Sequence, residues 1–262
     1  MAESTRFDLA GEEFLGEYDK VRGHVREMVT RANLTLWLPA GDALRVLDFG
    51  GGDGRDTVWL ANMRDHVTLL DESPNMVKLA TQAIKKAKIS ALGRIKIIEG
   101  GLEEVTNQTF DVVLSHGVLM YELNDPLSQL QALSDRLDTG GILSLLTKGH
   151  AAAEKQMTDS EAAERFKATG EYVNRRGLLA RAYRFGELED MLGRTGLETI
   201  ASYGVRLLSD EDSRRLNDVP GPELQAILEK EVAASRDSDL VEQAQMIHII
   251  ARKPAGQPAR ML

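Results

Sequence analysis

A chain of 262 residues, of which 42% are hydrophobic and 28% charged, has room for one large domain with insertions. It contains no cysteine, which excludes a disulfide, a thiolate metal site and a cysteine nucleophile. The formal net charge of −9 argues against non-specific nucleic-acid binding, although a local basic patch can still hold a structured RNA. The acidic N-terminus is unlike a secretion signal, and no apolar run approaches the roughly 20 residues that span a bilayer. We therefore expect a cytoplasmic protein without a metal or a membrane contact.

Strand-like apolar runs and helix-like spacings alternate along the first half of the chain. The expected elements are one or two helices within Glu12–Trp37, a strand over Leu44–Phe49, a helix over Arg55–Met63, a strand over Val67–Asp71, a helix from Ser73 to Ala87, and strands over Ile95–Ile98 and Phe110–Leu114. Ser73 is suited to cap its helix and Pro74 to occupy the first helical position.

The second half continues this pattern with interruptions. We expect a helix opened by Asp125–Pro126, carrying leucines up to Leu137 and ended by Gly140–Gly141, then a strand over Ile142–Leu146, a helix over Phe185–Leu192, a strand over Leu197–Tyr203, a helix around Leu224–Val232 and a strand over Met246–Ala251. Residues 149–183 are polar and alanine-rich and lack strand signals.

The alternation predicts an α/β protein with a Rossmann-like, seven-stranded, mostly parallel sheet and helices on both faces. We assign residues 1–40 to N-terminal helices covering the ligand site, and residues 41–148, 184–206 and 245–254 to the core. Residues 149–183 and 207–244 are insertions that we expect to form a helical cap over the carboxyl edge of the sheet. Residues 255–262 are expected to be a disordered tail.

The most informative stretch joins the first strand to its helix and has the form D-x-G-x-G-x-G, from Asp48 through Gly50, Gly51 and Gly52 to Gly54. A strand–turn–helix of glycines lets a ligand approach the backbone closely. A nicotinamide site favours G-x-G-x-x-G instead. An acid two residues before the first glycine suits an ammonium group better than a pyrophosphate. The pattern is that of the first motif of class I methyltransferases, which indicates S-adenosylmethionine; the alternative is a turn that serves only close packing.

Further candidates follow the next three strands. Asp71 ends the second strand 23 positions after Asp48, where an acid can accept hydrogen bonds from ribose hydroxyls, and Glu72 adjoins it. The alternative for Asp71 is a partner of the helix start. After the third strand, Leu102 is expected to pack on adenine beside Glu103. His116, after the fourth strand, is expected to line the site, although a lone histidine is often structural.

Several longer pieces carry a family resemblance. They are Arg22–Arg26, Leu44–Gly54, His116–Leu119, Gly141–Leu145, Gly204–Arg206 followed by Asp210, and Ile247–Pro254. In these the chain resembles, over most of its length, the bacterial tRNA 5-carboxymethoxyuridine methyltransferase (CmoM) family. The resemblance implies that Arg26, Gly51, Gly52, Asp71, Glu72, Leu102, Glu103 and His116 line the cofactor. The chain departs from the family on the substrate side: Arg175–Arg176 replaces a lysine-rich segment, Gly177–Tyr183 a proline-rich run, and Tyr121 a tryptophan.

The resemblance implies O-methylation of a carboxylate, with carboxymethoxyuridine at the tRNA wobble position as acceptor and S-adenosylhomocysteine as product. A carboxylate is ionised near pH 7 and needs no base, but a cation must orient it. Arg206 is the candidate, framed by Tyr121 and Tyr203; its alternative is a surface ion pair with Asp210. A phenol or hydroxyl acceptor would need a base, and His116 is the candidate.

Two further functions stay open. One is methylation of a small carboxylic acid or phenol, and the other is cofactor binding without catalysis, as in a sensor or scaffold. The arginines and the lysine between Arg165 and Arg184 could contact tRNA or form a solvated helical face. No oligomeric state is predicted.

Overall fold

The computed structural model describes residues 20–41, 43–63, 66–87, 92–157, 159–208 and 221–255. Most of the expected tail, the residues before Lys20 and the candidate partner Asp210 lie outside this part of the chain.

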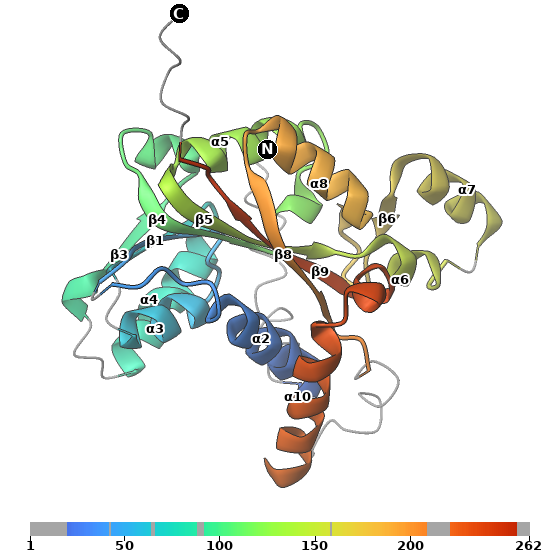
Figure 1. Ribbon diagram of the computed structural model, residues 1–262, viewed down its shortest axis with the longest axis horizontal. Helices are drawn as coiled ribbons and strands as arrows, with labels where there is room; N and C mark the ends of the chain where they lie inside the picture. Colours follow the sequence, from blue (N-terminus) through green and yellow to red (C-terminus); the bar gives the residue numbers. More distant parts are fainter. Residues whose placement is uncertain are drawn as a thin grey trace, which may run out of the picture.

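A seven-stranded sheet forms the centre of the molecule (Figure 1). Its strands are, in chain order, β1 (Arg45–Phe49), β2 (His66–Asp71), β3 (Ile95–Glu99), β4 (Phe110–His116), β5 (Leu137–Lys148), β8 (Glu198–Val205) and β9 (Met246–Arg252). They lie in the order β3-β2-β1-β4-β5-β9-β8, and β9 runs antiparallel to both neighbours while β1 to β5 pair in parallel. The predicted Rossmann-like fold is confirmed, and the carboxyl ends of β1, β2 and β4 meet at one edge.

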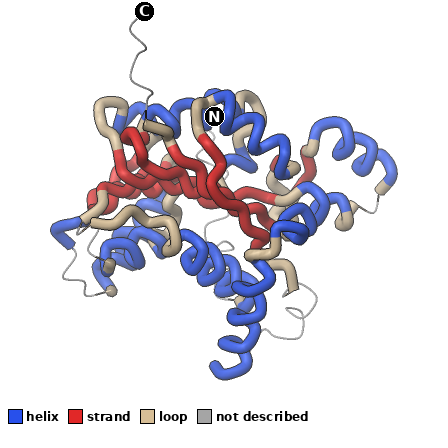
Figure 2. The backbone as a smooth tube through the Cα atoms, viewed as in Figure 1, coloured by secondary structure: helices blue, strands red, loops and turns tan. Residues whose placement is uncertain are grey.

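Helices cover both faces of this sheet, as the tube drawing shows (Figure 2). One face carries α5 (Pro126–Asp135) and α8 (Phe185–Arg194), and the other carries α2 (Val21–Leu34), α3 (Arg55–Asn62), α4 (Pro74–Lys86) and α10 (Gly221–Ser235). Alternation along β1 explains the two layers, because successive strand side chains point to opposite faces. Leu47 packs in the cluster with α5 and α8, whereas Val46 packs in the cluster with α2 and α3.

The sequence pattern suggested that Gly140 and Gly141 end a helix, but they do not. Helix α5 ends at Asp135, and β5 already includes both glycines. The pairing of β4 with β5 shifts register between Phe110 and Val112, opposite these glycines. A side chain on Gly141 would come within 3.0–3.1 Å of three backbone carbonyl oxygens, so the irregular pairing explains the glycine there.

The first insertion does contain strands, contrary to expectation. It folds as α6 (His150–Glu154), α7 (Ser160–Thr169) and a hairpin of β6 (Glu171–Val173) and β7 (Leu179–Arg181). Each of these strands has three residues, which is too short for a period-two pattern to appear. The remaining described elements are four short 3-10 helices: η1 (Leu92–Arg94), η2 (Leu102–Val105), η3 (Leu119–Tyr121) and η4 (Ser238–Gln243). In the second insertion, α10 packs against α2 and β8.

Candidate functional site

The glycine turn lies at the carboxyl edge of β1, where β1 passes into α3. Gly50, Gly52 and Gly54 have φ values of 66°, 54° and 80°, which strain any other residue. The amides of Gly50 and Gly51 donate to the Leu70 carbonyl at 2.8 and 3.3 Å, which ties the turn to β2. A Cβ on Gly50 would lie 2.3 Å from Val118 Cγ2, whereas a Cβ on Gly52 would meet no protein atom within 4 Å. Gly52 thus exposes bare backbone to the space beside it.

That space is a cavity of about 260 Å³. Of the predicted residues, Arg26, Asp48, Gly50, Gly51, Gly52, Asp71, Glu72, His116 and Tyr121 line it. Leu102 and Glu103 follow β3, whose last residue pairs with Asp71, but neither belongs to the cavity lining.

The cavity wall is strongly acidic. Seven carboxyl groups and two guanidinium groups line it, contributed by Glu27, Asp48, Asp53, Asp56, Asp71, Glu72 and Glu122, and by Arg26 and Arg55. Such a wall favours a ligand that carries positive charge. A sulfonium nucleoside with an ammonium group meets this requirement, whereas a diphosphate does not.

Asp48 is the most buried of these acids, with 3% of its surface exposed. The Thr57 hydroxyl donates to its Oδ2 at 2.6 Å. Burial, and then the negative charge of Asp56, raise the pKa of Asp48 to about 7 despite that hydrogen bond. A cation bound next to Asp48 would favour its ionised form.

Asp71 joins two parts of the site. Its Oδ2 accepts from the Gly52 amide and its Oδ1 from the Ser73 amide, both at 2.9 Å. Ser73 in turn caps α4, because its hydroxyl accepts from the Met76 amide at 3.2 Å, and Pro74 follows at the first helical position. Asp71 therefore holds the glycine turn and the start of α4 while lining the cavity.

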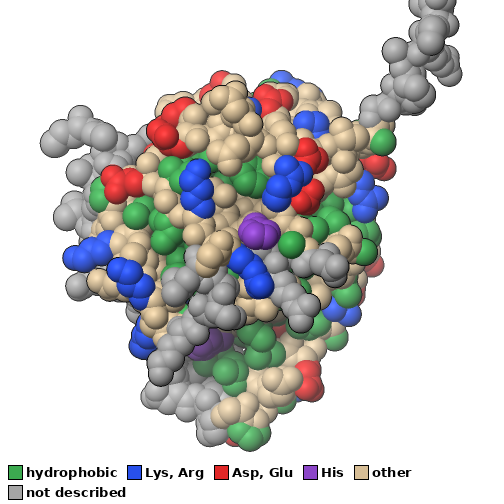
Figure 3. All heavy atoms as spheres, turned by 90° about the vertical axis from the view of Figure 1, so that its left-hand side faces the viewer, with side chains coloured by type: hydrophobic (Ala, Val, Ile, Leu, Met, Phe, Trp, Pro, Cys, Tyr) green, Lys and Arg blue, Asp and Glu red, His purple; other side chains and the backbone are tan. Residues whose placement is uncertain are grey.

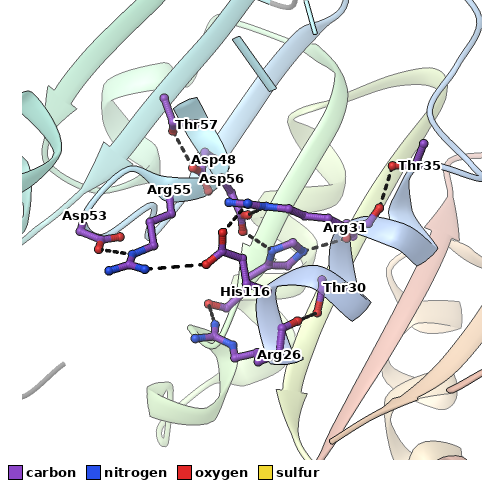
Figure 4. Close-up of polar contacts among 12 residues, drawn as sticks. Arg26, Thr30, Arg31, Thr35, Asp48, Asp53, Arg55, Asp56, Thr57 and His116 are labelled. Carbon is purple, nitrogen blue, oxygen red and sulfur yellow. Dashed lines mark hydrogen bonds and ion pairs between the residues drawn. The ribbon is translucent and has the colours of Figure 1, made fainter. Parts of the chain in front are cut away.

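His116 lies in a chain of partly buried polar groups, and Figure 4 shows its ring beside Asp56. Its Nδ1 lies 3.0 Å from Asp56 Oδ2, and its Nε2 lies 2.8 Å from the Ser144 hydroxyl. That hydroxyl also lies 2.9 Å from His248 Nε2. Both ring nitrogens of His116 therefore take part in hydrogen bonds within the protein. Its backbone carbonyl accepts from Arg26 Nη2 at 3.0 Å, which fixes Arg26 at the cavity wall.

The protonation of these hydrogen-bonded groups is set by His248 at one end of the chain and Asp56 at the other. His248 is fully buried, and this burial, together with the charge of His116, keeps its pKa well below the ordinary value. Burial would raise the pKa of Asp56, but the hydrogen bond and charge of His116, together with Arg31, hold it below the ordinary value. An ionised Asp56 thus accepts from His116 Nδ1. Sequence reasoning did not find Asp56, Ser144 or His248, although His248 falls within the family piece Ile247–Pro254.

A second cavity, of about 150 Å³, adjoins the first and has the opposite charge. Its lining consists of Arg22, Gly23, Arg26, Gly117, Met120, Tyr121, Lys148, Arg176, Arg206 and Met246. Among the described residues this wall contains five cations and no acid. Arg26, Gly117 and Tyr121 belong to both cavities.

Arg206 and Tyr203, the two remaining substrate candidates, lie in different parts of the structure. Arg206 follows β8 with a φ of 62° and lines the second cavity. Tyr203 is 7% exposed and belongs to the core cluster under β8, where its hydroxyl accepts from Trp37 Nε1 at 2.6 Å. Tyr203 is absent from the described lining of either cavity, because its position in β8 directs it to the face packed against Trp37.

Two further findings concern only the residues that the structure describes. No group of three or more His, Asp or Glu side chains there could hold a metal ion. Within the same ranges, none of the helices combines the length and apolarity needed to cross a membrane.

The strand order, the glycine turn and an acidic cavity at the carboxyl edge define a Rossmann-like enzyme that binds a positively charged nucleoside cofactor. Residues 40–193 match a family model described as a methyltransferase domain. The chain belongs to this family, and it is an S-adenosylmethionine-dependent methyltransferase.

Individual relatives agree with this assignment. The chain is 27% identical to the tRNA 5-carboxymethoxyuridine methyltransferase of Escherichia coli K12, over 96% of this chain and 97% of that protein. Among solved structures, it is similar to the 1,6-didemethyltoxoflavin-N1-methyltransferase of Burkholderia thailandensis, with a TM-score of 0.59, 18% identity and coverage of 96% and 87%. It is also similar to a Haloferax volcanii methyltransferase in complex with the Trm112 activator, with a TM-score of 0.64, 15% identity and coverage of 98% and 100%. At these identities the two structures support the fold alone.

Proposed function

We propose that the enzyme methylates a carboxylate oxygen, and that its acceptor is the carboxymethoxy group of a wobble uridine in tRNA. The observation that carries this proposal is the pairing of two cavities of opposite charge. An acidic cavity suits the cationic cofactor, and the adjoining basic cavity suits an anionic acceptor. The relative from Escherichia coli, which aligns over nearly its whole length, supports tRNA as the acceptor molecule and a cytoplasmic location.

The acidic cavity fits the cofactor in its chemistry. Asp48 would hold the ammonium group and Asp71 with Glu72 the ribose hydroxyls, while Gly52 allows close approach to the backbone and Gly50 and Gly51 line the cavity beside it. Leu102 and Glu103 do not line the cavity, but their place just after β3, whose last residue pairs with Asp71, supports assigning them to the adenine end. When bound, the cofactor supplies a methyl group on a sulfonium, whose transfer leaves a neutral sulfide.

The basic cavity would orient the acceptor. A carboxylate is already ionised near pH 7, so one of its oxygens can form the bond to the methyl carbon as the carbon–sulfur bond breaks, and no proton is moved. Arg206 would hold the second oxygen, with Tyr121 on the wall common to both cavities. Holding both reactants in adjoining cavities lowers the barrier through positioning. The hydrogen-bonded state of His116 agrees with a reaction that needs no base.

A small-molecule carboxylic acid is the second candidate acceptor. It is favoured by the pairing of basic side chains in the first insertion, where Arg165 meets Glu171 at 3.0 Å and Arg181 pairs with Glu187. On the face drawn in Figure 3, basic and acidic side chains are likewise intermingled. Neither feature provides a broad basic surface for tRNA.

Methyl-labelled cofactor distinguishes the two acceptors. The protein is incubated with it and either total tRNA or a small-metabolite fraction, and the labelled pool is identified. We expect label in tRNA, and a KM for tRNA that rises steeply with salt because phosphates contribute to binding. Label confined to metabolites would refute the tRNA acceptor.

A matched pair of variants tests the role of Arg206. Arg206→Ala should raise the acceptor KM or abolish transfer while S-adenosylhomocysteine still binds. Arg252→Ala, at the opposite end of the adjacent strand, should behave as wild type.

A further inference from the structure

The turn of the β6–β7 hairpin lies at the boundary between the two cavities. The Asn174 amide donates to the Leu178 carbonyl and the Gly177 amide to the Asn174 carbonyl, both at 2.9 Å. Gly177 has a φ of 74°. These features define a three-residue hairpin loop that ends in a left-handed glycine, a geometry that fixes the direction of the side chains it carries.

The side chain of Asn174 organises this turn. Its Oδ1 accepts from the Arg176 amide at 2.9 Å and from the Leu178 amide at 3.1 Å. Its Nδ2 donates to the Tyr121 hydroxyl at 3.3 Å. One amide group therefore closes the turn and ties it to η3, the element whose tyrosine lines both cavities.

Two residues of the turn reach the cavities as a result. Arg176 lines the basic cavity and Leu178 lines the acidic one. Arg175, between Asn174 and Arg176, is exposed and lines neither. One turn therefore places the Arg176 cation at the basic cavity and the apolar Leu178 side chain at the acidic cavity.

We propose that Asn174 is a positioning residue for the acceptor: it holds the hairpin turn against Tyr121 so that Arg176 binds the acceptor's negative charge next to the cofactor. This inference rests on the proposed transfer to an anionic acceptor and assigns part of the specificity to the first insertion. Arg176 and Arg206 contact the acceptor from two separate segments of the chain. Asn174 does not contact the acceptor itself and acts on it by placing Arg176.

The expected effects follow from that indirect role. Arg176→Ala raises the KM for tRNA about 10-fold to 100-fold, the range for a lost hydrogen bond to a charged group. Asn174→Ala raises the KM in the same direction by a smaller factor. The Kd of S-adenosylhomocysteine changes less than threefold in both variants. Arg176→Lys keeps the charge and recovers part of the affinity.

The decisive comparison is the double variant. If Asn174 acts through Arg176, adding Asn174→Ala to Arg176→Ala leaves the KM at that of Arg176→Ala alone. Arg175→Ala, in the same turn, is the matched control and keeps the wild-type KM. If Asn174→Ala does not fold, Asn174→Ser, which keeps an oxygen able to close the turn but is too short to reach Tyr121, takes its place.

A second readout needs no acceptor. Hydrogen exchange of the Arg176 and Leu178 amides should accelerate in Asn174→Ala and stay unchanged in Arg175→Ala. Equal exchange in both, or KM effects of Asn174→Ala and Arg176→Ala that add independently, would overturn the inference. Wild-type protein that labels no tRNA would instead refute the proposed function, and the KM comparison then uses the metabolite fraction that takes the label.

Discussion

Replacing Asp48 by asparagine separates two effects of its buried charge: the loss of folding stability that it causes and its contribution to cofactor binding. The pKa of Asp48 is raised from 3.8 to about 7, mainly by burial and by the charge of Asp56. The folded protein therefore holds this proton more tightly than the unfolded chain, and wild-type stability is lost as the pH rises from about 4 to 7. Three pKa units correspond to about 4 kcal/mol, which is an upper bound for the cost at pH 8. Asparagine removes the charge, and its side-chain oxygen can still accept from Thr57.

We expect Asp48→Asn to be more stable than wild type at pH 8, by up to about 4 kcal/mol, and the difference to vanish near pH 4. Without the carboxylate, the Kd of S-adenosylhomocysteine at pH 8 should rise at least about tenfold. Denaturant melts at both pH values and calorimetry measure the two effects. Asp190→Asn, on the exposed side of α8, is the control. Asp48→Asn with wild-type affinity, or with equal destabilisation at both pH values, would refute the reasoning.

Three other predictions concern the same cavity. Gly52→Ala and Gly140→Ala both place a side chain at positive φ with no protein atom within 4 Å, so both should lose about 1 kcal/mol of stability. Calorimetry should show lost S-adenosylhomocysteine affinity only for Gly52→Ala, and equal affinities would mean that the cofactor does not approach this backbone. Asp56→Asn should lower the Tm at pH 7 by roughly 5 °C, because its arginine and histidine partners lose an ionised acceptor. Since the pKa of Asp56 is lowered, that deficit should narrow only as the pH falls below about 4; a deficit constant with pH would contradict the ion-pair account. Cofactor binding at pH 6 should release protons as Asp48 ionises, and identical heats in buffers of different ionisation enthalpy would contradict this.

The cofactor side of the site was predictable from the sequence because its geometry is local. A strand, a glycine turn and a helix place Asp48 and Gly52 within a few residues of each other, and the next strand delivers Asp71 to the same edge. Parallel pairing alone then brings these groups together.

The acceptor side was less predictable because it gathers residues from distant segments. Arg22, Lys148, Arg176 and Arg206 come from a helix, a strand end, a hairpin turn and a loop, and their sequence spacing carries no common signal. The turn that presents Arg176 belongs to strands of three residues, which no periodicity could reveal.

The alternation of side chains along a strand explains why the position of Tyr203 was also not predicted. Tyr203 was expected to frame the substrate pocket with Tyr121, but alternation in β8 turns it toward Trp37 in the core. The chain from Asp56 through His116 to Ser144 and His248 was equally hidden, since it depends on the packing of α3, β4, β5 and β9.

The most direct test of a carboxylate acceptor is the chemical nature of the methyl linkage. After transfer from methyl-labelled cofactor, the tRNA is purified and treated with mild base, and the volatile label is measured. A methyl ester releases its label as methanol, and we expect nearly all of the label to be volatile. Label that stays with the tRNA would identify an ether or N-methyl product and contradict the account.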